Sequence, residues 1–572
     1  MGIDINKKQL PIGKSFFDNV IECESYYVDK TLFIKDLIDK DAAVILCTRP
    51  HRFGKTLNLT MLKCFFEDTA QIGSKDTRSL FRGLKIEEAG ERYMEHQGKH
   101  PVIFLSFKEA VKENINETYK VFKNIISEEF RRHSYVMEKI KYTVDLKGFE
   151  NISSGHGDIS LYYNSLEILS RCLENYHGKK SVVLIDDYDT PMQNAWTHGF
   201  YHEIIKFIYP LLGSVLKDNP HLEIAVMTGC LWVSTVGEFK GLNHLYVVSL
   251  LGYNYLEYFG FTQNEIDAML RYYGMEDKTQ IIKDWYNGYL FHETEMYNPW
   301  SSLHAVESWI TDINQQPKPY WEKDTSDNDI IREMIDKKNL NPNISSEIKV
   351  RLETLLSGKT ISTVVHEIIT YDKIYNDADY LWNFLFFTGY LKKVGVGRME
   401  GVKKVLDLSI PNLELLYIYE TKIQDGFKEM VRQKDFDPLY RAILDGDAET
   451  VQKELGNFLL ETICYLDAKE DFYHGVLLGV LAGMGEFTAK SNRETSLGLG
   501  DIVLRHTSDH GKAIIFELKC THDMREIVKL CEEAVKQMKD GKYAKELETE
   551  CYTDIIKYGI AFCKKSCEVR KG

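Results

Sequence analysis

Short apolar runs alternate with longer amphipathic stretches over roughly the first 250 residues of the chain. This alternation predicts an α/β fold with a parallel sheet, because parallel strands are buried on both faces and are joined by helical crossovers. The connections are long enough for right-handed crossovers. The expected strands are, in chain order, residues 43–47, 102–107, 182–185, 223–227 and 245–250.

The pattern changes to helical periodicity after about Thr262. Thr262 and Glu265 have the spacing of a capping box ahead of an amphipathic helix. We interpret the polar stretch 315–343 as a hinge into a second helical region, and from about Glu461 strands return in the order α–β–β–β–α. The chain is therefore expected to form three parts, which are residues 1–260, 261–455 and 456–572.

Composition narrows the class of protein. The 572 residues are 44% hydrophobic and 27% charged, which excludes a disordered chain. The formal net charge of −15 means that any nucleic-acid site must be a local basic groove. Eleven cysteines without a CxxC pair favour reduced thiols in an intracellular protein. Neither a signal peptide nor an apolar run of 18 residues occurs, so we expect a cytoplasmic protein with no membrane span.

A phosphate-binding loop is predicted where the first strand is followed by Gly54-Lys55-Thr56 and a helix. Backbone N–H groups at the helix N-terminus would face the phosphates, Lys55 would reach the terminal ones, and the Thr56 hydroxyl would ligate Mg²⁺. Arg49 stands where the pattern has its first glycine. By itself, the loop is therefore equally compatible with an ordinary basic turn.

Two consecutive acids, Asp186 and Asp187, end an apolar strand. That is the edge at which open α/β sheets bind ligands. We expect Asp186 to hold Mg²⁺ through water and Asp187 to polarise an attacking water. An acidic turn after a core strand is common, but together with the Gly-Lys-Thr loop it favours a nucleotide site. Hydrolysis is predicted less strongly, because Asp187 is one methylene shorter than the usual Glu.

These motifs resemble those of the AAA-ATPase-like family, whose members often end in a PD-(D/E)xK nuclease-like domain. The resemblance covers nearly the whole chain and extends through residues 10–13, 27–31, 185–189, 228–229, 285–289, 297–300, 388–391 and 410–412. It implies a P-loop ATPase-like parallel sheet with a helical lid and middle region, followed by a C-terminal α/β nuclease-like domain. It also implies that Arg52, Gly54, Lys55 and Thr56 bind ATP and that Thr228 is a sensor for the γ-phosphate.

Two departures from the family bear on ATP hydrolysis. The family usually has Glu at the position of Asp187. It usually has a basic residue a few positions after Thr228-Gly229, where this chain reads Cys230-Leu231-Trp232. A missing cation there would remove stabilisation of transition-state charge, so slow turnover is expected.

A second candidate site lies near the C-terminus. Two short apolar strands around a turn near residue 509 predict a hairpin. Folding there places Asp501 and Glu517 opposite each other, within about 5 Å. Lys519 shares the face of Glu517. Two carboxylates that hold Mg²⁺ or Mn²⁺, and a lysine that positions or activates the nucleophile, are what metal-dependent phosphodiester cleavage needs. The usual explanation of a lone Glu-x-Lys pattern is a surface salt bridge.

Further residues follow from the resemblance to the PD-(D/E)xK fold. Its later helix often supplies a polar active-site residue, which here is Gln537. His474 on the preceding helix either faces the site or is structural. Glu494 either completes the acidic cluster or is a surface charge. Leu499 stands where the family commonly has arginine, which would weaken phosphate binding.

Two functions are therefore considered. The first is an ATP-binding, ATP-regulated, Mg²⁺-dependent nuclease of DNA or RNA with weak ATPase activity. The second is a nucleotide-dependent switch or scaffold whose nuclease-like domain no longer cuts. The set Asp501, Glu517 and Lys519 favours the first, and the substitutions at positions 187, 232 and 499 favour the second. ATP and nucleic acid are the expected partners, and a homo-oligomer is compatible with either function.

Overall fold

The computed structural model describes residues 7–40, 42–233, 245–321, 342–461, 470–491, 501–507, 511–540, 547–550 and 552–572. The chain divides into two compact units. The first comprises residues 1–328 and 360–418, and the second comprises residues 329–359 and 419–572. The predicted division into three parts stays a prediction.

A five-stranded parallel sheet forms the centre of the first unit, in the order β2-β3-β4-β1-β6. Its strands are β1 (Val44–Thr48), β2 (Val102–Ser106), β3 (Ser181–Asp186), β4 (Leu222–Gly229) and β6 (Tyr246–Val248). All five strands predicted for this part of the chain are confirmed. Because β4 lies between β1 and β3, its carboxyl end is adjacent to both the predicted phosphate loop and the predicted acid pair.

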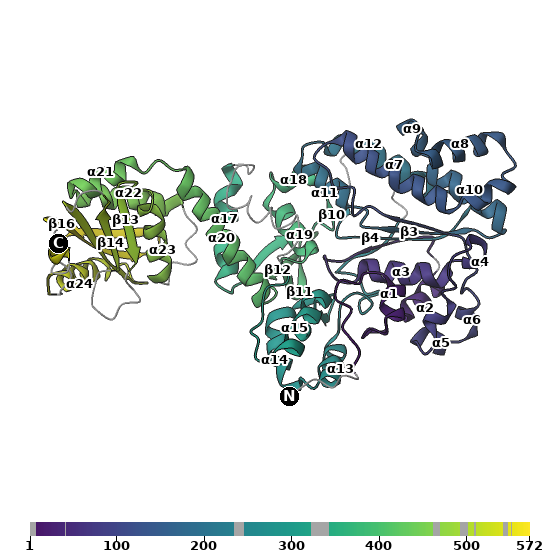
Figure 1. The fold of residues 1–572 in the computed structure, drawn as a ribbon, viewed down its shortest axis with the longest axis horizontal. Coiled ribbons are helices and arrows are strands. Elements are labelled where there is room, and N and C mark those ends of the chain that lie inside the picture. The colour runs from purple at the N-terminus through teal and green to yellow at the C-terminus, as the bar shows by residue number, and fades with distance from the viewer. Residues whose placement is uncertain are drawn as a thin grey trace. The chain divides into compact units, whose positions relative to one another are not determined.

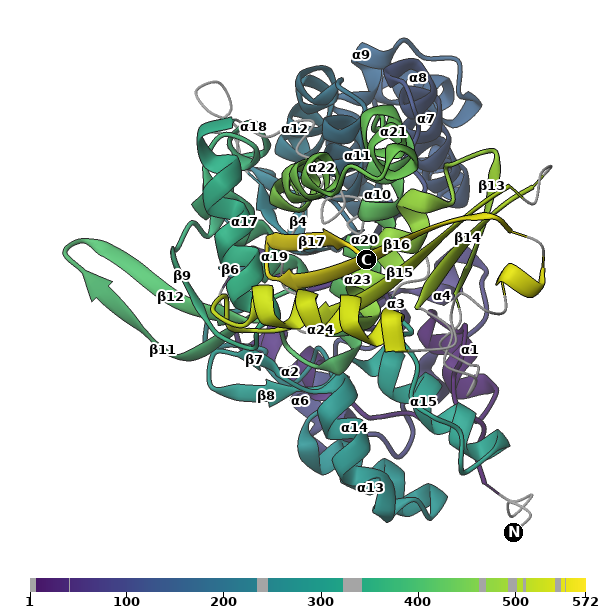
Figure 2. The same ribbon diagram turned by 90° about the vertical axis from the view of Figure 1, so that its left-hand side faces the viewer.

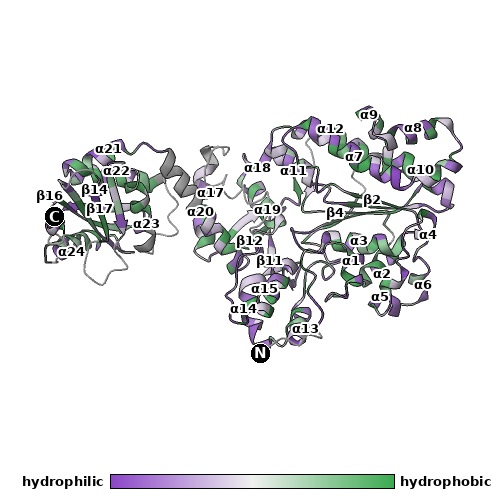
Figure 3. Cartoon of the chain, in the orientation of Figure 1, coloured by the Kyte–Doolittle hydropathy of each residue, from purple (hydrophilic) through white to green (hydrophobic). Residues whose placement is uncertain are grey.

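Helices cover both faces of this sheet (Figure 1). The long helices α7, α10 and α12 lie on one face, and α1, α2 and α3 lie on the other. Every residue of β1 and β3 is buried, which explains why each strand has an apolar run at its centre, residues 44–47 and 182–185. The strands of this sheet are coloured largely hydrophobic in Figure 3. The helices are α1 (Phe17–Glu22), α2 (Leu32–Asp39), α3 (Lys55–Phe66), α4 (Thr69–Ile72), α5 (Lys85–Glu88), α6 (Glu91–Met94), α7 (Ile115–Arg132), α8 (Thr143–Ser154), α9 (Ile159–Tyr162), α10 (Ser165–His177), α11 (Thr190–Thr197) and α12 (Tyr201–Leu216).

The rest of the first unit combines helices with short strands. The predicted capping box is confirmed, since the Thr262 and Glu265 side chains each bond the other's backbone at the start of α13. The elements are α13 (Gln263–Tyr273), α14 (Thr279–Tyr286), β7 (Tyr289–Phe291), β8 (Thr294–Met296), α15 (Pro299–Thr311), β9 (Ile361–Val364), β10 (Ile368–Ile369), α18 (Tyr371–Ile374), α19 (Ala378–Thr388), β11 (Lys392–Glu400) and β12 (Lys403–Ser409). The two-residue β5 (Trp232–Val233) pairs with β10.

The strands β7 to β12 correct the sequence-based description of this region as helical. Five of them form a two-stranded hairpin, β7–β8, and a three-stranded antiparallel sheet in the order β11-β12-β9, while β10 pairs with β5. Much of β11 is exposed and rich in Lys and Gly, so it lacks the continuous apolar run that identifies a buried parallel strand. Most of the predicted hinge, residues 322–341, lies outside the described residues.

The second unit contains a five-stranded sheet in the order β13-β14-β15-β16-β17. The predicted α–β–β–β–α order is confirmed by α23, β13, β14, β15 and α24. The elements of this part of the chain are α17 (Pro342–Leu356), α20 (Leu413–Gln433), α21 (Asp437–Asp445), α22 (Ala448–Glu461), α23 (Glu470–Leu481), β13 (Phe487–Ser491), β14 (Ile502–His506), β15 (Lys512–Cys520), α24 (Ile527–Asp540), β16 (Asp554–Cys563) and β17 (Ser566–Lys571). One apolar core lies between the sheet and α21–α23, and a smaller one lies under α24.

Candidate functional site

The predicted phosphate loop joins β1 to α3. Gly54 caps the N-terminus of α3 with a φ of 81°, a left-handed conformation that favours glycine, and no side chain caps the helix there. The backbone N–H groups of the first turn are therefore available to an anion. The structure thus places an uncapped helix N-terminus directly beside Lys55 and Thr56.

Lys55 is held inside the loop. Its ammonium donates to the carbonyl oxygens of Arg49 and Pro50 at 3.1 and 3.2 Å and lies 3.2 Å from the Cys230 thiol. It is also 3.9 Å from the Asp187 carboxylate. Burial alone would lower the pKa of Lys55, but nearby acidic groups outweigh burial and raise it, so the side chain carries its charge at neutral pH.

Asp186 is fully buried at the end of β3. Its two carboxylate oxygens accept hydrogen bonds from the hydroxyls of Thr56, at 2.6 Å, and Thr228, at 2.7 Å. Burial, reinforced by the charge of Asp187, raises the pKa of Asp186 to about 6. The structure therefore brings together the loop threonine, the strand-end acid and the threonine predicted to be a sensor.

The other two acids after β3 lie differently. Asp187 has a φ of 50° and a side chain that is 15% exposed, and it lies beside Lys55. Asp189 is buried and accepts hydrogen bonds from the backbone N–H groups of Cys230 and Leu231, both at 2.8 Å. A Cβ added to Gly229 would lie 2.5 Å from the Asp189 carboxylate. Asp189 therefore positions the end of β4, a role that the sequence reasoning missed although an acid before Thr190-Pro191 marks a helix start.

Arg49, which replaces the first glycine of the loop pattern, is completely buried and turned away from Lys55. Its guanidinium donates to the carbonyl oxygens of Thr48 and Val248 at 2.8 Å and lies over the rings of Phe259 and Phe291. The substitution thus ties the start of the loop to the neighbouring strand β6 and adds no charge to the phosphate side.

Arg52, which the family resemblance assigns to ATP, contacts the middle part of the unit. Its guanidinium donates to the Tyr320 carbonyl oxygen and lies 4.7 Å from the centre of the Trp300 ring. The backbone N–H of Tyr320 in turn donates to the buried Glu414, whose pKa burial raises to about 7. As placed, Arg52 links the loop to residues 300–320, and its role towards a nucleotide stays a prediction.

The second candidate site lies on the hairpin β14–β15. The register pairs Ile502 with Phe516, so Asp501 and Glu517 occupy the next opposed positions, as the hairpin argument predicts. Asp501 comes directly before β14, and its carboxylate accepts a hydrogen bond from the backbone N–H of Leu518 at 2.8 Å. Glu517 is 3% exposed. Both acids therefore lie at one end of this hairpin.

Lys519 completes the predicted group. Its ammonium lies 3.3 Å from the Glu517 carboxylate, and its side chain is 28% exposed, against 4% for Glu517. The lysine is thus the more accessible of the two partners. Asp501, Glu517 and Lys519 therefore come from the same hairpin, and their joint role as a metal and phosphate site stays a prediction.

His474 on α23 is 7% exposed and contacts the backbone of this site. Its Nε2 lies 3.1 Å from the Asp501 carbonyl oxygen and 3.2 Å from the Ser491 hydroxyl. It therefore joins α23 to the end of β13 and to Asp501. Gln537 lies on α24 with an exposed side chain. Glu494 and Leu499 lie outside the described residues.

The chemistry of the donor atoms fits Mg²⁺. Among the residues that the structure describes, no group of three or more His, Cys, Asp or Glu side chains is placed to hold a metal ion. Mg²⁺ is nevertheless commonly held by one or two carboxylates, with waters and substrate phosphates as the other ligands. Asp501 and Glu517 could hold such an ion at the hairpin, and Thr56 and Asp186 offer oxygens for one beside a bound nucleotide.

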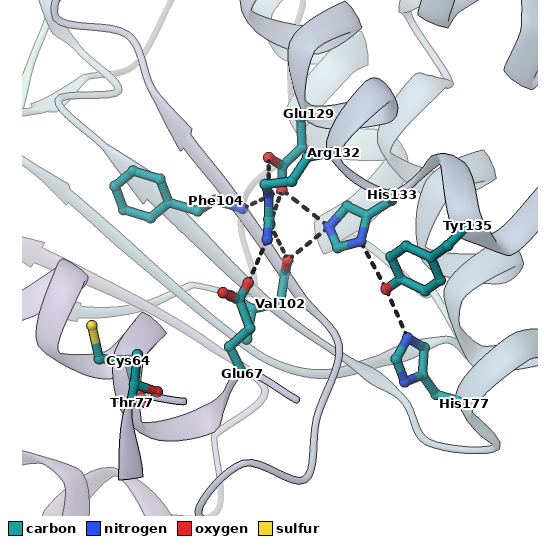
Figure 4. Close-up of polar contacts among 10 residues, drawn as sticks. All are labelled: Cys64, Glu67, Thr77, Val102, Phe104, Glu129, Arg132, His133, Tyr135 and His177. Carbon is teal, nitrogen blue, oxygen red and sulfur yellow. Dashed lines mark hydrogen bonds and ion pairs between the residues drawn. The ribbon is translucent and has the colours of Figure 1, made fainter. Parts of the chain in front are cut away.

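A third group of charged residues lies around the start of β2, at the amino ends of the strands of the first sheet, whereas the phosphate loop follows the carboxyl end of β1 (Figure 4). Glu129 accepts hydrogen bonds from Arg132 and from the backbone N–H of Phe104, and Arg132 also pairs with Glu67. Despite burial, the Arg132 guanidinium holds the pKa of Glu129 well below its usual range. This network ties α3 and α7 to β2 at the edge away from the phosphate loop, so its role is structural.

Two family models match the chain. Residues 11–239 match the AAA-ATPase-like model, described as a predicted AAA-ATPase, and residues 468–572 match the PD-(D/E)XK nuclease superfamily. The predicted domain architecture is confirmed by these matches. The chain is also 25% identical over 421 residues to an uncharacterized protein in the vnfD 5′ region of Azotobacter chroococcum mcd 1, covering 72% of this chain and 69% of that protein.

No solved structure matches the chain. Within the described parts of the chain, no helix is both long and apolar enough to cross a bilayer.

Proposed function

From a chain that joins an AAA-ATPase-like domain to a PD-(D/E)XK nuclease superfamily domain, we propose an ATP-regulated, metal-dependent nuclease. The N-terminal domain binds ATP with Mg²⁺ and turns it over slowly. The C-terminal domain cleaves phosphodiester bonds of DNA or RNA. The helical elements between them transmit the nucleotide state.

One observation carries the nuclease proposal. The β14–β15 register sets Asp501 opposite Glu517, and the Leu518 N–H holds the Asp501 carboxylate in place. Two carboxylates fixed on a rigid hairpin are a preorganised oxygen site for a divalent cation. The ammonium of Lys519, 3.3 Å from Glu517, is close enough to serve the same substrate.

Each residue has a distinct proposed task. A bound Mg²⁺ or Mn²⁺ supplies charge neutralisation at phosphorus and a water of lowered pKa. Asp501 and Glu517 hold and orient that cation. Lys519 positions the phosphate or the nucleophile through its charge, and Gln537 supplies a polar contact from α24. Removal of either acid is therefore more damaging than removal of any neighbouring surface charge.

Support for nucleotide binding comes from two contacts of Asp186 and one of Asp187. Thr56 and Thr228 present their hydroxyls to one carboxylate, and Lys55 lies beside Asp187 at the uncapped start of α3. In this proposal Thr56 and Asp186 hold the Mg²⁺ that accompanies ATP, Lys55 contacts the terminal phosphates, and Asp187 orients water.

The test is incubation of the purified protein with plasmid DNA, linear DNA and RNA, with Mg²⁺, Mn²⁺ or EDTA, and with or without ATP. We expect metal-dependent cleavage whose rate changes with ATP. The Asp501→Asn protein is the negative control for contaminating nucleases. Equal cleavage by that variant, or the absence of cleavage of every substrate with both metals, would refute the nuclease function.

A second candidate, a nucleotide-dependent switch that binds without cutting, is favoured by the end of β4. There the chain presents Cys230, Leu231 and Trp232, where the resemblance led us to expect a basic residue. Lys55 is engaged by loop carbonyls and Cys230. ATP binding with no measurable hydrolysis and no nuclease activity in the same preparation would favour this function over the first.

A further inference from the structure

The middle part of the first unit contains the strand β9, the two-residue strand β10, the helices α18 and α19, and the hairpin β11–β12, in that order. The second hairpin strand, β12, pairs with both β11 and β9. A first strand that pairs with the last strand of a returning hairpin, with helices between them, is the topology of a winged helix, in which the hairpin is the wing. The hairpin extends away from the other elements of its unit (Figure 2).

The helix α19 of this motif exposes almost no side chain through which it could contact a ligand. Ten of the eleven residues of α19 are buried, all except Asp379, and they include Trp382 and several Phe side chains. A helix that is apolar on all sides belongs to a protein core. Any ligand of this motif must therefore meet the hairpin rather than α19.

The far half of the hairpin exposes apolar side chains. Val396 is 83%, Met399 64% and Val402 94% exposed. The two-residue turn between the strands consists of Gly401, which has a φ of 63°, and Val402. The register between β11 and β12 shifts between Val394 and Arg398, which marks an irregular outer strand. Exposed apolar side chains gathered at the tip of one hairpin are a candidate contact surface for a partner.

The charge of the hairpin indicates the kind of partner. Residues 392–409 contain five Lys and Arg and two acids, a net charge of +3 in a chain of net charge −15. Arg398 is neutralised by Glu400 and Asp407. Lys403 and Lys404 are exposed, and in the described part of the chain neither forms an ion pair. Burial and then Lys404 lower the pKa of Lys393, which is consistent with an excess of positive charge.

We propose that the β11–β12 hairpin binds double-stranded nucleic acid, with Lys403 and Lys404 on backbone phosphates and Val396 and Val402 in a groove. A two-stranded β-ribbon fits a major groove, where apolar side chains contact the methyl group of thymine. The local basic surface is the kind that an acidic chain needs to bind a polyanion. The inference names the substrate form of the proposed nuclease and in that sense rests on the proposed function.

Binding is measured by fluorescence anisotropy with the full chain in EDTA, so that cleavage plays no part. The probes are a duplex DNA of about 20 base pairs, the same duplex in RNA, and single-stranded DNA, each between roughly 50 and 200 mM salt. Lys403→Ala/Lys404→Ala should weaken binding to a duplex about tenfold or more. It should also reduce the slope of log affinity against log salt by about 2, because two phosphate contacts are lost.

Val396→Ser/Val402→Ser should weaken duplex binding without changing the salt slope, since no charge is removed. Lys112→Ala/Lys120→Ala, which removes two exposed lysines at α7 and the segment before it, is the matched control and should change neither quantity. Both hairpin variants should retain the ATP-induced rise in thermal stability of the wild type, which shows that the unit is folded.

Unchanged duplex binding by the lysine variant overturns the inference, as does single-strand binding as tight as duplex binding. A change of oligomeric state in the hairpin variants without loss of duplex binding also overturns it, in favour of a second copy of the chain. These outcomes are separate from cleavage. Metal-dependent cleavage together with duplex binding that the hairpin substitutions leave unchanged would refute the role of the hairpin but not the nuclease function. Duplex binding that depends on the hairpin, without any cleavage, would refute the nuclease function but not the role of the hairpin.

Discussion

The two candidate sites use the same kinds of side chain but assemble them differently. At the first, Asp186 and Asp187 are neighbours in sequence, and their partners Lys55 and Thr228 come from other strands or loops of a parallel sheet. At the second, Asp501 and Glu517 are 16 positions apart in sequence and are opposed by one antiparallel hairpin. The first site depends on the strand order, and the second depends on a single turn.

Burial separates the two sites further. Asp186 is fully buried with two hydroxyl partners, and its pKa is raised to about 6. The second site pairs a buried Glu517 with a partly exposed Lys519. A nearly closed carboxylate suits a cation that arrives with a nucleotide, whereas an accessible lysine suits a large polyanionic substrate. We infer that the same residue types suit different ligands at the two sites because they differ in their exposure to solvent.

The largest effect is expected at the second site. Asp501→Asn and Glu517→Gln should each reduce metal-dependent cleavage by on the order of 1000-fold, because the cation loses a charged ligand. Lys519→Ala should also abolish cleavage but leave Mn²⁺ binding largely intact. Calorimetric Mn²⁺ titration separates the two effects, with Asp554→Asn as a surface control from the same unit.

The metal-free folds of Asp501→Asn and Glu517→Gln should be no less stable than the wild type, because two close carboxylates without a cation repel each other. If cleavage survives in either acid variant, the carboxylates belong only to a surface salt bridge, and the second site is not a metal-dependent catalytic site.

The network of Glu67, Glu129 and Arg132 at the amino end of β2 should contribute to the stability of the fold and not to nucleotide binding. Glu129→Gln removes one of the two carboxylates that pair with the partly buried Arg132 and should lower the free energy of unfolding by about 3 kcal/mol. Urea denaturation at pH 7 measures this loss, and Glu128→Gln on the exposed side of α7 is the control. Loss of the ATP-induced stabilisation in Glu129→Gln would contradict the structural role.

ATP with Mg²⁺ should raise thermal stability by about 2.7 kcal/mol at a hundredfold excess over its Kd, since it binds only the folded chain. Lys55→Ala should remove that rise, and Lys63→Ala in the last turn of the same helix should retain it. Differential scanning fluorimetry is sufficient. An equal shift for Lys55→Ala would mean that ATP binds elsewhere.

The smallest effect is the pH dependence of the first site. Asp186 has a folded pKa of about 6, raised above that of the unfolded chain, so its ionised form destabilises the nucleotide-free fold. This cost is present above about pH 6 and disappears as the pH falls below the unfolded value near 4. Asp186→Asn should therefore be more stable than the wild type at pH 7.5, and the difference should shrink towards pH 4.

Chemical denaturation at several pH values, without nucleotide, measures that difference. Asp189→Asn is an informative second variant, because Asp189 also has a pKa raised to about 6 but carries two backbone hydrogen bonds. The amide oxygen of Asn can still accept both bonds, but as a neutral acceptor it binds them more weakly than a carboxylate, which should offset part of the gain. A wild type that is more stable than Asp186→Asn at pH 7.5 would show that the Thr56 and Thr228 hydroxyls outweigh burial.

Local patterns were sufficient for several elements. The strands β1 to β4, the capping box at Thr262 and the β14–β15 register follow from periodicity, cap chemistry and turn position, which act over a few residues. The strands β7 to β12 could not be predicted in this way, because short or exposed strands lack a continuous apolar run. The role of Arg49 was also hidden, since the carbonyl oxygens that bind it come from residues 48, 248 and 255.

By itself, the sequence determined the Gly-Lys-Thr loop, the acids after β3 and the opposed acids of the C-terminal hairpin, because each depends on neighbours in the chain or on one turn. Only the tertiary structure decided that Asp186 lies between the hydroxyls of Thr56 and Thr228. That arrangement requires β4 to lie between β1 and β3, and strand order is set by packing between distant segments, which leaves no period in the sequence.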